Sequence, residues 1–165
     1  MPATPWKMPP LVKVYEALGA IGDGRVRIDD ERRATVTSSD GSKAYEVETS
    51  ADGREIASND NASYWQGYVG YPAIAVLLAR GFYRPPATIT DALAGVAWKE
   101  INRKNKNDWS ATIADLEKEL EQGGHDPDAA RSEAEAVLSF LRTLRPVRGK
   151  RTKPPSSEKG AVRIR

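Results

Sequence analysis

Residues 25–58 read RVRIDDERRATVTSSDGSKAYEVETSADGREIAS, and apolar side chains stand at every second position in three parts of this stretch. Around Val26, Val36 and Val47 they alternate with charged or hydroxyl side chains, a period of two that is typical of strands with one buried face. Two Asp-Gly pairs, which tolerate the positive φ of tight hairpin turns, interrupt the alternation. These pairs are Asp40-Gly41 and Asp52-Gly53. The stretch therefore predicts an antiparallel β-meander of three or four strands.

The segments on either side of the meander show helical spacing of apolar residues. A short helix is expected after Pro9-Pro10, and Pro72 opens a helix that is apolar nearly all round up to Gly81. A helix without a polar face is usually buried, so this second helix is expected at the centre of the core. Three more helices are expected over about residues 88–144. The predicted fold class is α+β: the meander packs on a buried central helix, and a three-helix C-terminal part and a basic tail follow.

The chain has 165 residues, which is enough for one ordinary domain and too few for two. We expect an extended N-terminal segment over residues 1–10, a single domain over residues 11–144, and a basic disordered tail over residues 145–165. The tail is expected to be disordered because apolar residues become rare after Pro146, and too little surface can be buried to offset chain entropy.

The composition excludes several kinds of catalytic and metal site. Cysteine is absent, which removes disulfides, thiolate nucleophiles and cysteine-based zinc sites. His125 is the only histidine, so one chain cannot build a two-histidine metal site. The acidic side chains between Asp115 and Glu121 are expected to form a solvated helix surface. We therefore expect no cofactor, no bound metal and no enzymatic activity.

The sequence shows neither of the two signals that direct a chain to a membrane. Its longest apolar run falls well short of the roughly 18 residues that a membrane span needs. Residues 1–10 contain four prolines and lack the apolar segment of a signal peptide. We expect a soluble cytoplasmic protein that has no membrane partner.

The charges are divided unevenly along the chain. Residues 142–165 contain nine Lys and Arg against Glu158 alone, whereas the preceding 141 residues contain 16 basic and 22 acidic side chains. Clustered Lys and Arg on an acidic protein point to an anionic partner, and they bind the phosphate backbone of nucleic acid by releasing counterions. The alternatives are anionic lipid, an acidic protein, or no partner. The predicted nucleic-acid contacts in the tail are Arg145, Arg148, Lys150, Arg151 and Lys153.

A second basic group lies between two tryptophans, Trp98 and Trp109. Lys99, Arg103 and Lys106 are spaced four and three residues apart, so on a continuing helix they would share a face and extend the nucleic-acid surface. The tryptophans would stack on bases if they were exposed. The simpler interpretation, which we favour, is that both tryptophans belong to the core and the basic side chains form a solvated edge.

Four aromatic residues occur within eight positions between the meander and the central helix. They are Tyr64, Trp65, Tyr68 and Tyr71. Such a cluster serves as a stacking platform for bases or as a hot spot for a protein partner, although more often it covers a core. If a protein partner binds here, the predicted contacts are Tyr64, Trp65 and Tyr68.

Residues 44–80 resemble a SWIM-type zinc-finger module in the order of their elements. A predicted hairpin leads to a loop that contains Tyr64 and Trp65, and a helix then begins at Pro72, as in that family. The positions that match the family's metal ligands carry neither Cys nor His. The resemblance therefore implies a degenerate, metal-free module that is held together by apolar packing. The four positions are Ser58, Asp60, Gly70 and Pro72.

These features together predict a non-catalytic binding module that associates with nucleic acid, either RNA or DNA, or with a ribonucleoprotein through its basic tail. The alternative is a protein–protein adaptor that uses the aromatic loop Tyr64–Tyr71. The third reading is an enzyme of unknown chemistry, which would show a deep polar cleft with buried carboxylates.

Overall fold

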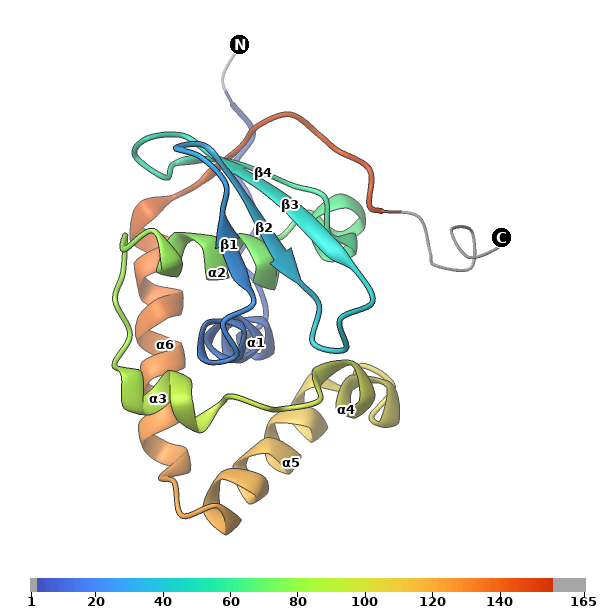
Figure 1. The fold of residues 1–165 in the computed structure, drawn as a ribbon, viewed down its shortest axis with the longest axis vertical. Helices are drawn as coiled ribbons and strands as arrows, with labels where there is room; N and C mark the ends of the chain where they lie inside the picture. Colours follow the sequence, from blue (N-terminus) through green and yellow to red (C-terminus); the bar gives the residue numbers. More distant parts are fainter. Residues whose placement is uncertain (1–2, 156–165) are drawn as a thin grey trace.

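The computed structural model describes residues 3–155, in which helices cover one face of a single five-stranded sheet (Figure 1). The strands are β1 (Val26–Ile28), β2 (Arg33–Thr37), β3 (Ala44–Thr49), β4 (Glu55–Ser58) and β5 (Val147–Arg148). The helices are α1 (Leu11–Gly22), the π-helical turn η1 (Ala62–Gln66), α2 (Tyr71–Ala79), α3 (Ala87–Ala92), α4 (Trp98–Lys104), α5 (Trp109–Gln122) and α6 (Pro127–Leu144). Strands β1 to β4 pair in sequence order as antiparallel neighbours. The predicted α+β class and meander are confirmed.

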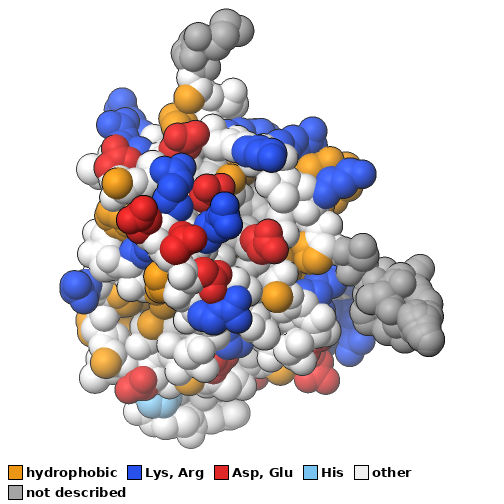
Figure 2. All heavy atoms as spheres, turned by 45° about the horizontal axis from the view of Figure 1, so that its top comes forward, with side chains coloured by type: hydrophobic (Ala, Val, Ile, Leu, Met, Phe, Trp, Pro, Cys, Tyr) orange, Lys and Arg blue, Asp and Glu red, His pale blue; other side chains and the backbone are white. Residues whose placement is uncertain are grey.

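Strand pairing places the apolar positions of the meander on one face of the sheet. Ala34 pairs with Val47 and Val36 pairs with Tyr45, and all four side chains are buried. Because side chains alternate along a strand, the charged positions between them face outward. On the side of the molecule that carries this outer face, Figure 2 shows acidic and basic side chains intermingled. The outer face of the sheet is therefore a mixed-charge surface.

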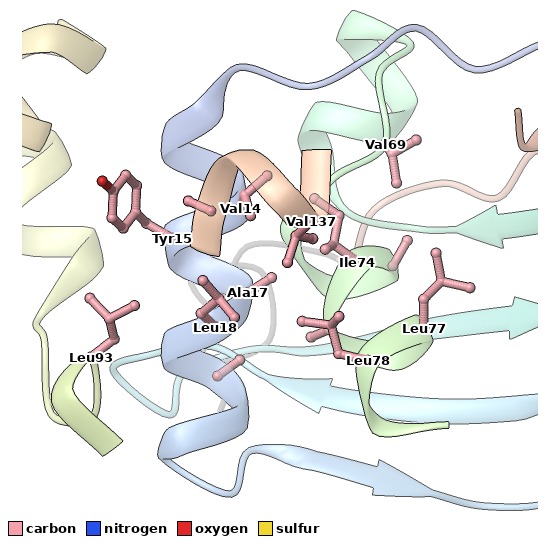
Figure 3. Close-up of a cluster of buried hydrophobic side chains, with 14 of the residues drawn as sticks. Val14, Tyr15, Ala17, Leu18, Val69, Ile74, Leu77, Leu78, Leu93 and Val137 are labelled. Carbon is pink, nitrogen blue, oxygen red and sulfur yellow. The ribbon is translucent and has the colours of Figure 1, made fainter. Parts of the chain in front are cut away.

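Helix α2 is the buried central helix that the sequence predicts. Every residue from Pro72 to Leu78 is buried, and α2 contacts α1 and the first four strands. In Figure 3, Ala17 of α1 points toward α2, and Val137 of α6 joins the same cluster. Each large apolar side chain buried in this way contributes on the order of 1.5–3 kcal/mol. The core therefore lies between the sheet and the outer helices.

The C-terminal helical part is confirmed, and the first helix expected there is divided into α3 and α4. Gly95 lies between them with a φ of 81°, which a right-handed helix cannot accommodate. Its N–H donates a hydrogen bond of 2.6 Å to Oδ1 of Asp23. Among residues 3–155, no helix has both the length and the apolar character needed to cross a membrane.

The beginning of the predicted tail is part of the sheet. Val147 N–H donates to the carbonyl of Arg54 at 2.7 Å, and Gly149 N–H donates to the carbonyl of Ile56 at 2.8 Å, so β5 lies parallel to β4. The domain boundary expected at residue 144 is therefore too early. Low apolar content suggested disorder, but strand pairing uses backbone groups that composition does not report. Residues 156–165 of the predicted tail lie outside the described residues.

The N-terminal segment is extended and lies against the same sheet edge. Trp6 N–H donates to the carbonyl of Pro146 at 3.0 Å, and Arg148 N–H donates to the carbonyl of Thr4 at 2.7 Å. Lys7 N–H in turn donates to the carbonyl of Gly67, at the end of η1. The two ends of the described chain thus support each other and the loop that follows β4.

Val147→Pro is expected to lower the free energy of unfolding by about 1–3 kcal/mol, because the buried edge would lose one N–H and leave the Arg54 carbonyl without its donor. Val147→Thr keeps the N–H and the β-branched shape and serves as the control. Urea denaturation measures both variants. Equal midpoints for the two would contradict the assignment of β5 to the folded domain.

Candidate functional site

Four parts of the chain enclose a cleft of about 500 Å³. They are residues 61–71, which contain the aromatic loop Tyr64–Tyr71, helix α1 with Arg25 shortly after it, the β2–β3 hairpin, and α4 with the start of α5. Small-molecule sites commonly occupy roughly 300–1,000 Å³, so the cleft has the size of a ligand site. Its aromatic lining residues are Tyr45, Trp65, Tyr68, Tyr71, Trp98 and Trp109, and its charged lining residues are Lys13, Glu16, Arg25, Lys99 and Arg103. The fold thus brings the aromatic loop and the second basic group together around one space.

A buried carboxylate holds the aromatic loop in place. Asp60, which is 4% exposed, accepts hydrogen bonds from Ser58 Oγ (2.5 Å), Ser63 Oγ (2.7 Å) and Ser63 N–H (3.1 Å). Ser63 Oγ also accepts from Gly70 N–H at 3.2 Å. Because a Cβ at Gly70 would lie 2.0 Å from Asp60 Oδ2, only glycine fits between the carboxylate and the start of α2.

The side chains of the aromatic loop point to different surroundings. Trp65 is 68% exposed and lines the cleft, and its ring packs edge-on against Tyr64 with the centroids 4.6 Å apart. Tyr68 and Tyr71 are partly buried and also line the cleft. Tyr71 packs edge-on against Tyr45. The loop therefore has one freely accessible aromatic ring, that of Trp65. The rings of Tyr68 and Tyr71 are partly buried and held by the residues around them.

Burial controls the ionisation of the cleft tyrosines. Removal from water, together with the smaller effect of nearby acidic side chains, raises the pKa of Tyr45 and of Tyr68 to about 12. Burial also raises the pKa of Tyr71, partly opposed by the neighbouring Arg25. These hydroxyls therefore remain protonated at neutral pH and are able to donate hydrogen bonds to a ligand.

Helix α4 carries two of the three basic residues expected on its face. Lys99 and Arg103 are exposed and line the cleft. Lys106 does not share their face, because α4 ends at Lys104 and both Lys106 and Asn107 adopt left-handed backbone conformations. Regular spacing alone could not reveal this break, since it assumes a helix that continues.

Most cations of the cleft are already paired with acidic groups. Lys99 Nζ lies 3.2 Å from Asp40 Oδ2, and hydrogen bonds from Ser42 hold the pKa of Asp40 below its usual range, so this carboxylate stays charged. Arg25 pairs in the same way with Asp23. Arg103 forms no ion pair with any residue in the range 3–155. Arg103 is thus the cleft cation best placed to meet an anionic ligand.

The two tryptophans that bracket this basic group differ in exposure. Trp98 is 3% exposed and belongs to the core, as the simpler interpretation holds. Trp109 is partly buried, and Lys13 Nζ lies 4.6 Å from the centroid of its ring. A ligand in the cleft could therefore contact only the small exposed part of Trp98 and the larger exposed part of Trp109.

The sequence did not reveal Glu16, which is a nearly buried acid in the lining of the cleft. Its side chain is 5% exposed and lies on α1, where seven consecutive residues from Val14 to Ala20 are buried. The available signal was a single acid within a helix that is otherwise almost entirely apolar. A buried carboxylate needs hydrogen-bond partners, and Glu16 has them in Lys13 and Asn102.

The basic residues predicted in the tail occupy two kinds of position. Arg148 is partly buried, lies over the Trp6 ring at 4.8 Å and donates to the carbonyl of Gly67, so its role is structural. Arg151 is exposed and lies 4.1 Å from the centroid of the Tyr64 ring, on the loop that also carries Trp65. The remaining three, which are Arg145, Lys150 and Lys153, are exposed.

Comparison with known proteins corrects the resemblance to the SWIM zinc finger. A family model described as uncharacterised conserved protein UCP014422 matches residues 6–147, which include all of residues 44–80. Neither a curated protein nor a solved structure matches the chain. Within residues 3–155, no group of three or more His, Cys, Asp and Glu is arranged to hold a metal ion.

The SWIM interpretation is therefore wrong, and its failure has a physical reason. A hairpin, a loop and a helix follow one another wherever a meander leads into a covering helix, so this order alone does not identify a family. Three of the four presumed ligand positions do lie close together. At Ser58, Asp60 and Gly70 the structure has a hydrogen-bonded carboxylate cluster instead of a metal-ligand set.

Gly70→Ala is expected to lower the free energy of unfolding by about 1–3 kcal/mol, because the added methyl group would displace the Asp60 carboxylate. Gly149→Ala is the matched control, since a Cβ there meets nothing closer than 3.4 Å, and a change within about 0.5 kcal/mol is expected. Chemical denaturation measures both. Indistinguishable stabilities would show that Asp60 does not fix the loop as described.

The raised pKa values of Tyr45 and Tyr68 predict a loss of stability at high pH. Unfolded tyrosines ionise near pH 10, so between about pH 10 and pH 12 the unfolded state releases protons that the folded state retains, and the free energy of unfolding falls as pH rises. An absorbance titration of phenolate, with circular dichroism to monitor folding, tests this. Complete ionisation near pH 10 in the folded protein would contradict it.

Proposed function

The chain belongs to the family described as uncharacterised conserved protein UCP014422, and we propose that it is a non-catalytic module that binds single-stranded nucleic acid in the cleft. The observation that carries this proposal is that exposed Trp65 and Arg103, which forms no ion pair within residues 3–155, line one cleft. Both residues were separate candidates in the sequence. The exposed cations Lys150, Arg151 and Lys153 would hold the strand beyond the aromatic loop.

Stacking surfaces favour a single strand over a duplex. Bases present their faces only when they are unpaired, and stacking on an aromatic side chain contributes about 1–3 kcal/mol per base. Trp65 offers an exposed indole at the cleft, and Tyr68 and Tyr71 offer partly accessible rings beside it. The outer face of the sheet is a poorer candidate for a polyanion, because acids lie among its arginines and pair with two of them, Arg27 with Asp29 at 2.6 Å and Arg32 with Glu48 at 3.3 Å.

The unpaired cations favour contact with phosphate at a few points. A cation that already has an acidic partner gains less from a phosphate than one that has none. Lys13, Arg25 and Lys99 are paired, whereas Arg103 has no acidic partner within residues 3–155. Arg151 connects the tail to the loop through the Tyr64 ring, which itself contacts Trp65. A strand lying across Trp65 would therefore meet cations on both sides of the loop.

The cleft contains one of the features expected of an enzyme, namely a buried carboxylate. Glu16 is the one carboxylate among the cleft residues, and its hydrogen bonds to Lys13 and Asn102 hold it in place. His125 is exposed between α5 and α6 and does not line the cleft. A second carboxylate or a histidine beside a nucleophile, which acid–base catalysis would need, is not among the lining residues of the described chain. This lining supports the proposal of a binding function. A cytoplasmic location remains part of the same proposal.

A protein–protein adaptor remains the second candidate, and the 68% exposure of Trp65 is the observation that favours it. Exposed tryptophans are frequent at the centres of protein interfaces. The basic residues of the cleft would then be incidental. The two candidates differ in the role of Arg103. Binding of a nucleic acid in the cleft would depend on this cation, whereas binding of a protein through Trp65 would not.

Fluorescence anisotropy with a labelled single-stranded oligonucleotide tests the proposed function. Trp65→Ala is expected to weaken binding by roughly 5- to 100-fold through lost stacking. Arg103→Ala is expected to weaken it by a few fold and to reduce the slope of log affinity against log salt by about one.

Two variants control for general effects of these substitutions. Ile28→Ala removes the other large exposed apolar side chain of residues 3–155, and Arg142→Ala removes an exposed helical arginine outside the cleft. Both are expected to bind like the unchanged protein. Binding that is insensitive to salt, to Trp65→Ala and to Arg103→Ala alike would refute the nucleic-acid proposal.

A further inference from the structure

A second pocket, of about 340 Å³, lies between the N-terminal segment, the end of β4, η1 and residues 148–151. In Figure 1 the segment after α6, drawn in red, runs along the β4 edge toward the turn that follows β4. The basic lining residues of this second pocket are Arg148, Lys150 and Arg151, and its aromatic lining residues are Trp6 and Tyr64. Its volume is at the lower end of the roughly 300–1,000 Å³ of ligand sites.

The charges of the second pocket are less balanced than those of the cleft. No Asp or Glu is among its lining residues in the described chain, and its three cations form no ion pair within residues 3–155. The Asp60 carboxylate lies behind two lining serines, Ser58 and Ser63, and accepts hydrogen bonds from their hydroxyls. The three cations outnumber this single acid. The second pocket therefore attracts an anion.

Two of the cations are accessible from solution. Lys150 is exposed, and its side chain forms no hydrogen bond within residues 3–155. Arg151 is also exposed and donates from Nη2 to the carbonyl of Tyr64 at 3.3 Å, which leaves the other N–H groups of its guanidinium without a partner in the described chain. Arg148 is held over the Trp6 ring and adds a fixed positive charge. An anion in the pocket would therefore be bound by Lys150 and Arg151.

The turn η1 separates the second pocket from the cleft. Ala62 and Trp65 of this turn line the cleft, whereas Ser63 and Tyr64 line the second pocket. The rings of Tyr64 and Trp65 have their centroids 4.6 Å apart, and the guanidinium of Arg151 lies 4.1 Å from the centroid of the Tyr64 ring. A continuous surface therefore leads from the exposed indole at the cleft, over a single turn, to the cations of the second pocket.

We infer, on the basis of the proposed function, that the second pocket holds a phosphate of the same strand whose base stacks on Trp65. The phosphates of a strand are connected to its bases, so a strand stacked on Trp65 brings a phosphate to the second pocket as an intramolecular contact. Arginine and lysine both bind phosphate, and arginine does so with paired N–H groups. An acidic peptide would meet the same cations but has no bases to stack on the ring that leads to them.

A labelled single strand with one base and otherwise abasic positions tests the inference by fluorescence anisotropy. Only that base can stack on Trp65, so the register of the strand is fixed. A neutral methylphosphonate linkage replaces one phosphate at a time. At the linkage that reaches the second pocket we expect a loss of affinity of roughly 5- to 10-fold, and at linkages distant from both sites a loss below about twofold.

The double variant Lys150→Ala/Arg151→Ala removes both accessible cations. The loss at that linkage should then disappear, and the slope of log affinity against log salt should fall by roughly 0.7, the contribution of one phosphate on a single strand. A second sensitive linkage, beside Arg103, should remain and should respond to Arg103→Ala instead. Because Arg151 also donates to the aromatic loop, Lys150→Ala alone repeats the measurement with that hydrogen bond intact and should reduce the loss.

The double variant Lys118→Ala/Arg142→Ala is the matched control. Both residues are exposed helical cations, and neither lines the cleft or the second pocket. This variant should show the same loss at the same linkage as the unchanged protein.

The outcomes separate this inference from the proposed function. If the strand does not bind, both fail. If every linkage tolerates the methylphosphonate alike, or if the loss survives Lys150→Ala/Arg151→Ala, the second phosphate site is wrong and the proposed function stands. UMP binding that depends on Lys150 and Arg151, without a sensitive linkage in the strand, would support a phosphate and overturn the strand as its source. Competition by oligoglutamate as strong as by the unlabelled strand would overturn phosphate as the ligand.

Discussion

The buried carboxylate of Asp60 is the interaction on which the binding surface depends. It joins Ser58 at the end of β4 to Ser63 in η1, and its close approach to Gly70 fixes the start of α2. The Asp60 carboxylate therefore holds β4, η1 and the start of α2 together. The loop between these elements is ordered without burying its largest side chain, Trp65. The hydrogen bonds of Asp60 hold this loop, while its Trp65 side chain is 68% exposed.

Local periodicity was sufficient to predict the meander and the central helix. Alternation around Val36 and Val47, and the uninterrupted apolar run after Pro72, are properties of neighbouring residues, and the tertiary structure leaves them unchanged. Strand β5 could not be predicted in this way, since its partner β4 lies about ninety residues earlier and the pairing uses backbone groups. The order of elements that suggested a SWIM module was too general to identify a family.

The cleft itself lay beyond sequence reasoning, although most of its parts had been singled out. Which loops meet depends on how α1, the hairpin and α4 pack, and no local pattern encodes that meeting. Lys106 left the expected face because the chain turns at Lys106 and Asn107. Glu16 was detectable in principle, since an acid in the middle of a buried helix requires partners, but the residue that orients it, Asn102, comes 86 positions later.

Within residues 3–155, most cations that line the cleft are paired with acids of the same domain. Three of the four basic residues in the cleft are neutralised by acids of the same domain, and these acids account for part of its negative balance. Electrostatic attraction at the cleft is therefore restricted to a small number of points. Restricting attraction in this way favours ligands that also fit by shape and hydrogen bonding over polyanions in general.

The hydrogen bond between Arg148 and Thr4 joins the two ends of the described chain, and its consequence concerns how the protein is made. During translation the outer edge of β4 has no backbone partner until residues 147–149 have left the ribosome, since the only earlier contact there within the described chain is the hydrogen bond from the Trp6 indole to the carbonyl of Ile56. The sheet is therefore completed only after residues 147–149 have been synthesised. A nascent chain that stalls before this point exposes an unpaired strand edge, which is a template for pairing with a second chain.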